Sequence, residues 1–245
     1  MSATTVDRAF RLDFDQAISF VGRDRNWLPK LGLGALFSFL TVIIVGYVLI
    51  QGYLLTLMQR VARLEPEPLP EWDEYGEFLR KGAVVTAVNL AYYLPYWLII
   101  IALYIMQTLL PLVFTQSVSS SLGPFIAVPI GLTLLGYLIT VPLGLLLGVT
   151  MPAVHAQLAL YDADFAAAFR LREIWGFIDR HRGQYALAVV LALAANYFLS
   201  FVGYLACCVG IFVTSFLAQL FQAHMLGQLC WYERVRASRL GSDYP

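Results

Sequence analysis

The chain has 245 residues, of which 60% are hydrophobic and 13% are charged, and its formal net charge is zero. Soluble domains carry about 25% charged residues, so this composition is typical of a membrane protein. The balanced charge gives no sign of a nucleic-acid partner, and three cysteines do not form a disulfide framework.

Three long blocks contain no Asp, Glu, Lys or Arg: residues 31–59, 82–161 and 183–232. About 20 apolar residues cross the hydrocarbon of a bilayer, so these blocks hold several spans. A water-soluble fold with as much uncharged sequence would expose large apolar patches and aggregate. We therefore predict an all-α, polytopic membrane helix bundle that forms a single membrane domain over residues 1–245, with the lipid bilayer as its partner.

Residues 1–30 are polar and mixed in charge, and we expect an N-terminal amphipathic segment and no cleaved leader. Asp13 stands where it can cap a helix, with Gln16 three residues later. Trp27 lies just before the first uncharged block, and we expect it to anchor the chain at the membrane interface.

The first hydrophobic block, residues 31–59, has positive charge beyond both ends. As one helix it would be roughly 43 Å long, enough to cross once at a steep tilt and too short for two full crossings. A single span would place five positive charges outside the cell. A re-entrant hairpin that bends near Gly46 keeps both ends inside, and the charge rule favours this alternative over one span.

The segment PLPEWDEYGEFLRKG, residues 68–82, carries the densest charge in the chain directly before an uncharged block. Trp72, Tyr75 and Leu79 recur at helical spacing. We expect an interfacial acidic-aromatic helix over residues 64–82, with Trp72 and Tyr75 as anchors at the headgroup level. The role of the acidic stretch 65–77 stays open.

Two span pairs follow, over residues 83–152 and 185–231, with approximate spans at 83–110, 125–152, 185–204 and 207–231. Gly144 and Gly148, four residues apart, are typical of close helix packing. Between the pairs, residues 163–183 predict an interfacial helix capped by Asp164 and anchored by Trp175. Residues 232–245 form the C-terminal tail.

All sixteen Lys and Arg residues fall in four polar segments, whereas the loops near 112–123 and 201–208 have none. Basic segments stay cytoplasmic, so we expect a multi-pass protein of the cell membrane with both termini in the cytoplasm. Two span ends also resemble each other, QLALYD at 157–162 and QLCWYE at 228–233. This repeat predicts an internal duplication in which a surface helix leads into a span pair.

Four stretches together resemble the DUF4013 family of uncharacterised prokaryotic membrane proteins: AISFVGRDRNWLPKLGLG, VGYVLIQGYLLTLMQRVA, PLPEWDEYGEFLRKG and AHMLGQ. The P-L-P-E-W-D-E-Y element is the most specific of them. The resemblance implies a membrane location and a helical fold. It implies no activity, because the family has none assigned.

The residues give little support to an enzyme, and we predict that the protein is not one. His155, His181 and His224 have no metal-ligand spacing, and the chain lacks a phosphate loop and a nucleophile elbow. We therefore assign no catalytic, cofactor-binding or metal-binding residue and expect no cofactor. A membrane enzyme acting on lipid is the least favoured reading.

Polar residues inside the predicted spans allow two interpretations. Ser215, Gln219 and Gln222 lie at i, i+4 and i+7 on one helix face, and Asn89 and Asn196 stand in other spans. In the first interpretation these side chains line a path for a neutral or amphiphilic solute. In the second they form hydrogen bonds between helices and fix the bundle. Without a buried carboxylate, ion-driven transport is less favoured than facilitation.

The function favoured by the sequence is a non-catalytic membrane scaffold or accessory subunit, with other membrane subunits as possible partners and no nucleic acid. Three interfacial segments with Trp27, Trp72 and Trp175 suit this role. A water-filled cavity that reaches the middle of the membrane beside Gln219 and Gln222 would favour a facilitator instead. A dry bundle with a flat apolar flank would favour the subunit, and a cluster of histidine and carboxylates within about 4 Å would favour an enzyme.

Overall fold

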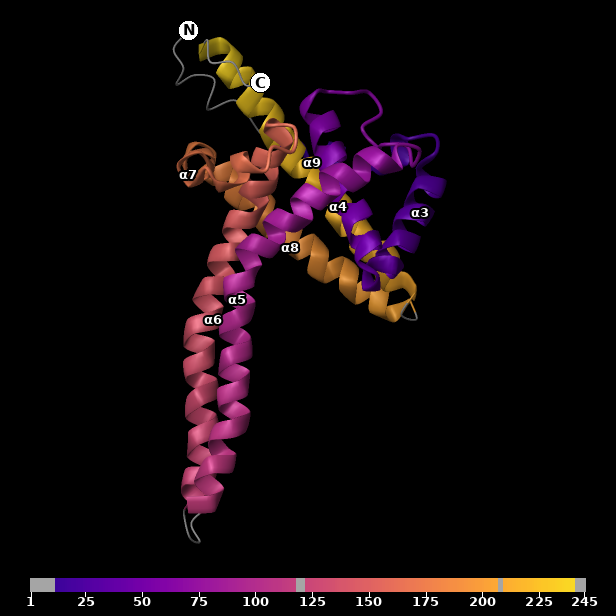
Figure 1. Ribbon diagram of the computed structural model, residues 1–245. Coiled ribbons are helices and arrows are strands. Elements are labelled where there is room, and N and C mark those ends of the chain that lie inside the picture. Colours follow the sequence, from indigo (N-terminus) through magenta and orange to yellow (C-terminus); the bar gives the residue numbers. More distant parts are fainter. Residues whose placement is uncertain (1–11, 118–121, 207–208, 241–245) are drawn as a thin grey trace. The chain divides into compact units, whose positions relative to one another are not determined.

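The computed structural model describes residues 12–117, 122–206 and 209–240, and within them the chain is helical with no strand (Figure 1). The predicted all-α class is confirmed. The elements in chain order are α2 (Phe14–Arg23), α3 (Trp27–Phe39), the 3₁₀ helix η1 (Leu40–Val42), α4 (Ile44–Ala62), α5 (Tyr75–Ser117), α6 (Leu122–Leu160), the 3₁₀ helix η2 (Ala166–Phe169), α7 (Leu171–Arg180), α8 (Arg182–Leu205) and α9 (Val209–Leu240).

The chain divides into two compact units. The core unit contains residues 1–87 and 152–245, and the hairpin unit contains residues 88–151. Helices α5 and α6 begin or end in the core unit and contribute their long apolar stretches to the hairpin unit.

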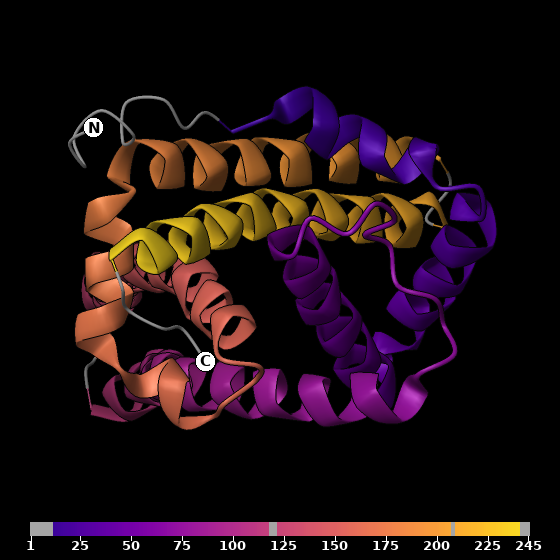
Figure 2. The ribbon, with the colours of Figure 1, turned by 90° about the horizontal axis from the view of Figure 1, so that it is seen from above.

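The core unit is built around α9, which packs against α2, α3, α4 and α8. Figure 2 shows α8 and α9 lying side by side along their length. Large apolar and aromatic side chains are fully buried between these helices, and burial of that kind is the main source of stability. They include Tyr53, Tyr185, Phe216, Leu57 and Met225.

Helices α4 and α5 touch through their backbones at two glycines of the core unit. A Cβ added to Gly52 would collide with the carbonyl of Phe78, and one added to Gly82 with the carbonyl of Val48. Only glycine permits such a close approach of two helices. This crossing fixes where α5 leaves the core unit.

The hairpin unit consists of the apolar parts of α5 and α6, which lie next to each other (Figure 1). The Gln107 amide donates to the Thr133 hydroxyl at 2.7 Å across the pair. A Cβ at Gly144 would lie 3.4 Å from the Tyr96 hydroxyl, whereas Gly148 has nothing within 4 Å. Of the two glycines expected to pack, Gly144 therefore faces the neighbouring helix and Gly148 does not.

The first hydrophobic block is broken rather than continuous. Helix α3 ends at Phe39, η1 covers Leu40–Val42, and α4 begins at Ile44. Gly46 lies against the carbonyls of Phe37 and Leu40, where a Cβ would collide, so glycine is required just after the break. The bend falls close to its expected position. Whether the block is a re-entrant hairpin or crosses the bilayer stays a prediction.

The segment 64–82 differs from its expected form, because its helix begins only at Tyr75. Residues 63–74 form turns, bends and irregular backbone. Three prolines between 66 and 70 remove backbone donors and disfavour helical geometry in the residues before them. Trp72 therefore lies in a loop, not on the face of a helix.

The two predicted helix caps have different outcomes. Asp13 caps α2 as expected, since its Oδ1 accepts from the backbone N–H of Gln16 at 2.9 Å. Asp164 instead precedes η2 and accepts from the N–H of Ala166 at 3.1 Å, while α7 begins later, at Leu171. The helix expected over 163–183 is thus divided into a 3₁₀ turn and a ten-residue helix.

In the described residues, four helices are long and apolar enough to cross a membrane: Ile44–Ala62, Tyr75–Leu109, Pro129–Leu160 and Arg182–Leu205. The last three overlap the spans expected at 83–110, 125–152 and 185–204. Helix α9, where a span was expected at 207–231, is not among the four. Cys207 and Cys208 lie outside the described residues, as do 118–121 of the loop expected near 112–123.

Candidate functional site

The predicted polar lining is partly brought together in the core unit. Gln219 and Gln222 of α9 line a cavity of about 110 Å³, together with Gln51 of α4 and His155 of α6. A cavity of this size holds water where several polar groups line it, as they do here. No local sequence pattern marks Gln51 as a lining residue, because its place beside α9 depends on the packing of two helices that are distant in the sequence.

The other candidate polar residues do not join this cavity. Ser215 is half-buried on α9 one turn before Gln219, and it is not among the lining residues. Asn89 is buried at the start of the hairpin unit. Asn196 is exposed on α8. The structure therefore supports a lining by Gln219 and Gln222 alone among the five.

A larger cavity, of about 520 Å³, lies in the core unit between α2, the end of α4, residues 64–68 and α9. Phe20 and Trp231 contribute aromatic surface, and the buried His224 stacks against Phe20 with ring centroids 4.4 Å apart. Four acidic residues, Asp13, Asp24, Glu65 and Glu67, also line it, together with one basic residue, Arg23.

A buried ion pair lies beside this cavity. The Lys30 ammonium bonds to Asp24 Oδ2 at 2.7 Å and to Glu71 Oε1 at 2.8 Å, and both Lys30 and Asp24 have side chains only 3% exposed. Lys30 also donates to the Leu69 carbonyl at 3.1 Å. Burial acts to lower the pKa of Lys30, but the bonds to Asp24 and Glu71 outweigh it and raise that pKa above its usual value.

Trp72 bonds to the backbone of Lys30, a member of the same ion pair. Its indole N–H donates to the Lys30 carbonyl at 3.0 Å, and its ring stacks on Tyr53 at 4.2 Å. Trp72 is only 7% exposed, so the expected interfacial anchor is instead part of the core. Three residues of the P-L-P-E-W-D element, Leu69, Glu71 and Trp72, therefore bond to Lys30 of α3.

The other three expected anchors are exposed. Trp27 is 38% exposed, Tyr75 is 41% exposed and Trp175 is 46% exposed. These positions are compatible with contact to lipid headgroups. Their role as anchors stays a prediction.

A second polar network joins α4, α5 and the end of α6. Lys81 donates to Gln59 Oε1 at 2.6 Å, and Gln59 Nε2 donates to Asp162 Oδ1 at 3.1 Å. Glu77 pairs with Lys81 at 2.5 Å. In this network the buried Gln59 and Lys81 therefore each have a partner, which is what burial of polar groups requires.

The two similar span ends have different surroundings. Gln157 and Tyr161 both donate to Glu173 Oε2, at 2.8 and 3.1 Å. Gln228 instead forms a pair of bonds with the backbone of Asp13, each 2.9 Å long. Both ends hold a surface helix in place, α7 in one case and α2 in the other. The internal duplication itself stays a prediction.

One histidine contacts a carboxylate. His181 Nε2 lies 3.2 Å from Glu233 Oε2, and Arg180 bonds to Glu233 Oε1 at 2.6 Å. Neither His181 nor Glu233 is among the residues that line the two cavities above. In the described part of the chain, no group of three or more His, Cys, Asp or Glu residues is placed to hold a metal ion.

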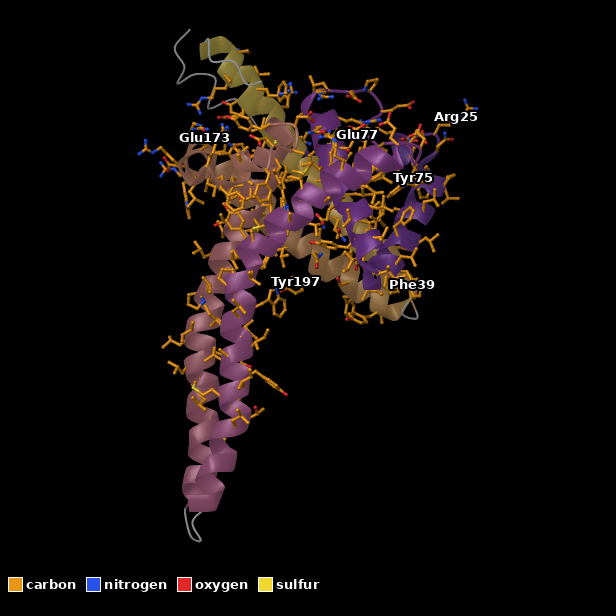
Figure 3. The ribbon with its side chains drawn as sticks, in the orientation of Figure 1. Arg25, Phe39, Tyr75, Glu77, Glu173 and Tyr197 are labelled. Carbon is orange, nitrogen blue, oxygen red and sulfur yellow. The ribbon has the colours of Figure 1, made fainter. Side chains whose placement is uncertain are left out.

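Charged and apolar groups separate to opposite ends of the core unit. Figure 3 shows Glu77 and Glu173 at one end and Phe39, at the turn between α3 and α4, at the other. Phe39 packs edge-on against Phe212 of α9 at 5.3 Å, so the start of α9 lies at the same end as this turn. Exposed apolar side chains cover that end, namely Phe39, Ile43, Ile44, Val45, Tyr204 and Leu205.

Comparisons with known proteins place the chain in a family without adding an activity. Neither a curated protein nor a solved structure matches it significantly. The family described as "Protein of unknown function (DUF4013)" matches residues 35–209, a range that contains the P-L-P-E-W-D-E-Y element and both helices of the hairpin unit. Because the match covers well over half of the chain, the protein belongs to the DUF4013 family.

Proposed function

We propose that the protein is a non-catalytic accessory subunit or scaffold of the cell membrane, which contacts its partner through the hairpin unit. The observation that carries this proposal is the surface of that unit. No described side chain from Leu90 to Leu146 is buried, and none of these residues is charged. Both helices therefore present apolar side chains on every side, a surface that needs lipid or another membrane helix around it.

The state of the polar groups in the core unit also supports a non-catalytic role. Lys30, Lys81 and Glu233 each bond to neighbours within the same unit. Such pairs hold elements together and leave few groups to act on a substrate. The contact of His181 with Glu233 is the only feature of the described residues that favours an enzyme, and Arg180 already neutralises the carboxylate.

The separation of charge supports a multi-pass arrangement with cytoplasmic termini. Arg60 and Arg63 line one small pocket with Glu77, and Arg170 lies 3.6 Å from Glu173. These cations therefore belong to the charged end of the core unit, while the turn at Phe39 is apolar (Figure 3). Positive charge remains on the cytoplasmic side of a bilayer. The apolar turn then points into the membrane.

Site-specific photo-crosslinking tests the proposal. A benzophenone amino acid replaces Tyr104 in the hairpin unit or, as a matched control, Tyr197 of α8; both tyrosines are strongly exposed. In native membranes we expect the crosslinker at position 104 to form an adduct with one discrete protein, and the same protein to co-purify in a fixed ratio. The crosslinker at position 197 should form adducts with lipid. Lipid adducts alone at both positions would overturn the subunit proposal.

A facilitator for a neutral solute is the second candidate, because Gln219 and Gln222 do line a cavity. In proteoliposomes this function predicts uptake of small neutral solutes such as glycerol or urea. The double variant Gln219→Leu/Gln222→Leu should abolish that uptake, whereas the exposed Asn196→Leu should leave it unchanged. Uptake no faster than in empty liposomes would exclude this candidate for the solutes tested.

A further inference from the structure

The cavity of about 520 Å³ in the core unit has no part in the function proposed above, and its chemistry is specific enough to define a ligand. Its volume lies within the range of about 300–1,000 Å³ that is typical of small-molecule sites. Aromatic rings of Phe20, Trp231 and His224 line it together with several carboxylates. Binding of a ligand in this cavity does not depend on the accessory-subunit role.

A chain of hydrogen bonds fixes the proton on His224. The N–H of Asp13 donates to Gln228 Oε1, which orients the amide so that Gln228 Nε2 donates to the Asp13 carbonyl. The same Nε2 lies 3.2 Å from His224 Nδ1 and donates its second hydrogen there. His224 Nδ1 is therefore an acceptor, and Nε2 carries the ring hydrogen.

This N–H belongs to a side chain only 2% exposed that lines the cavity. Within the described residues, no side chain or carbonyl accepts from His224 Nε2. The cavity wall thus presents a hydrogen-bond donor to which an oxygen acceptor of a ligand can bond.

The charged groups at the rim leave an excess of negative charge. Asp24 is neutralised by Lys30 at 2.7 Å, and Glu65 lies 3.6 Å from Arg60. The side chains of Glu67 and Arg23 pair with no residue in the described part of the chain. Together with the Asp13 carboxylate, the rim offers two anionic groups and one guanidinium.

The backbone brings Glu67 to this rim through an unusual turn. Leu64 has φ of 56°, a conformation that leucine rarely adopts, and it directly follows α4 and its capping residue Arg63. The turn directs residues 65–68 along the cavity, where Pro66 and Pro68 restrict the chain on either side of Glu67. Glu67 is therefore held near the cavity by a short, stiff segment.

We propose that this cavity binds a small amine that also carries a phosphate, the chemistry of ethanolamine phosphate. The ammonium group bonds to Glu67 and Asp13 and lies against the faces of Phe20 and Trp231. The phosphate oxygens accept from His224 Nε2 and pair with Arg23. Free ethanolamine phosphate and the headgroup of phosphatidylethanolamine both have this chemistry.

The test uses the full chain in nanodiscs of phosphatidylglycerol, which has no amine. Equilibrium dialysis measures binding of radiolabelled ethanolamine phosphate and, separately, ethanolamine. A second arm uses discs with equal phosphatidylethanolamine and phosphatidylglycerol, and native mass spectrometry counts the lipid retained by the released protein. Saturable binding in the first arm identifies the soluble source, and selective retention in the second arm identifies the lipid.

Rim variants tie the binding to this cavity without disturbing the fold, because neither side chain pairs with a described residue. We expect Glu67→Gln to weaken both amines about tenfold, the loss of roughly 1.4 kcal/mol from one charged hydrogen bond. Arg23→Gln should weaken ethanolamine phosphate about tenfold and ethanolamine less than twofold. Asp15→Asn is the matched control, an exposed carboxylate on the same helix outside the cavity, and should change neither.

The outcomes separate cleanly. Absence of binding in both arms overturns the proposal, and so does binding that Glu67→Gln leaves unchanged. Equal weakening of ethanolamine and ethanolamine phosphate by Arg23→Gln would overturn the assignment of the phosphate to Arg23. Failure of the crosslinking experiment at Tyr104 has no bearing on any of these results.

Discussion

The core unit and the hairpin unit differ in what stabilises their helices. The core unit buries ion pairs such as Lys30 with Asp24 and packs large rings around α9. The hairpin unit buries no described side chain between Leu90 and Leu146 and carries no charge. Its helices are joined by contacts that include the Gln107–Thr133 bond. The core unit is held by its own contacts, whereas the hairpin unit depends on what surrounds it.

The largest effect should come from the backbone crossing of α4 and α5. Gly82→Ala places a Cβ against the Val48 carbonyl, and neither helix can move without disturbing the core, so we expect a loss of about 3 kcal/mol or more. Unfolding by SDS titration in mixed micelles measures it. Gly148→Ala, in the hairpin unit, meets nothing within 4 Å and should be neutral or slightly stabilising. Equal losses for both variants would contradict the contrast between the units.

Breaking the buried ion pair should have the next largest effect. Lys30→Met leaves the Asp24 carboxylate buried without its cation and should cost about 3 kcal/mol in the same unfolding measurement. The double variant Lys30→Met/Asp24→Leu should recover much of this loss, because it leaves no unpaired charge. A double variant less stable than Lys30→Met would contradict the expectation.

The same pair gives a pH dependence with a defined sign. The pKa of Lys30 is raised above 10.5, its value when unfolded, so its stabilising effect is complete below that pH and is lost as the pH rises through the higher folded pKa. The difference in stability between the wild type and Lys30→Met should therefore stay constant from pH 7 to about pH 10. A steady decline over that interval would show that the pair does not hold the proton.

Trp72 tests the burial of the P-L-P-E-W-D element. Trp72→Phe removes the donor to the Lys30 carbonyl and part of the stack on Tyr53, for a loss of about 1–2 kcal/mol. Trp97→Phe in the hairpin unit is the matched control, since Trp97 is more than half exposed, and should change stability by less than about 0.5 kcal/mol. A larger loss for Trp97→Phe than for Trp72→Phe would contradict the burial of Trp72 and favour its role as a surface anchor.

The smallest effect should come from the bond within the hairpin unit. Gln107→Leu removes the bond to Thr133 and should cost about 0.6 kcal/mol, the average for such bonds between membrane helices. Gln59→Leu is the comparison in the core unit, where the same change leaves Lys81 and Asp162 without their shared partner. It should cost several times more, and a loss no larger than that of Gln107→Leu would contradict the contrast.

The features that could be predicted from the sequence depend on local patterns. The Asp13 cap of α2, the position of the bend near Gly46 and the apolar character of α5 and α6 each follow from residues within a few positions of one another. The fold class follows from the uncharged blocks, which are also local features of the sequence. These features needed no knowledge of which helices meet.

The features that were missed depend on contacts between distant residues. Trp72, Tyr75 and Leu79 have helical spacing, but the prolines before them and the pairing of Lys30 with Glu71 place Trp72 in the core. Gln51 joins Gln219 and Gln222 only because α4 packs on α9. The ring hydrogen of His224 is placed by Gln228, whose amide is oriented by the backbone of Asp13. Asp13 lies 211 positions before His224 in the sequence. No local periodicity encodes such meetings.

The paired bonds between Gln228 and the backbone of Asp13 have a consequence for biosynthesis, because 215 positions separate the two residues. At about 5–20 residues per second, the ribosome needs roughly 10–45 s to add that length. During that interval α2 lacks its contacts with α9, since α9 does not yet exist. The face of α2 that packs on α9 is therefore available to chaperones or targeting factors until α9 has been synthesised.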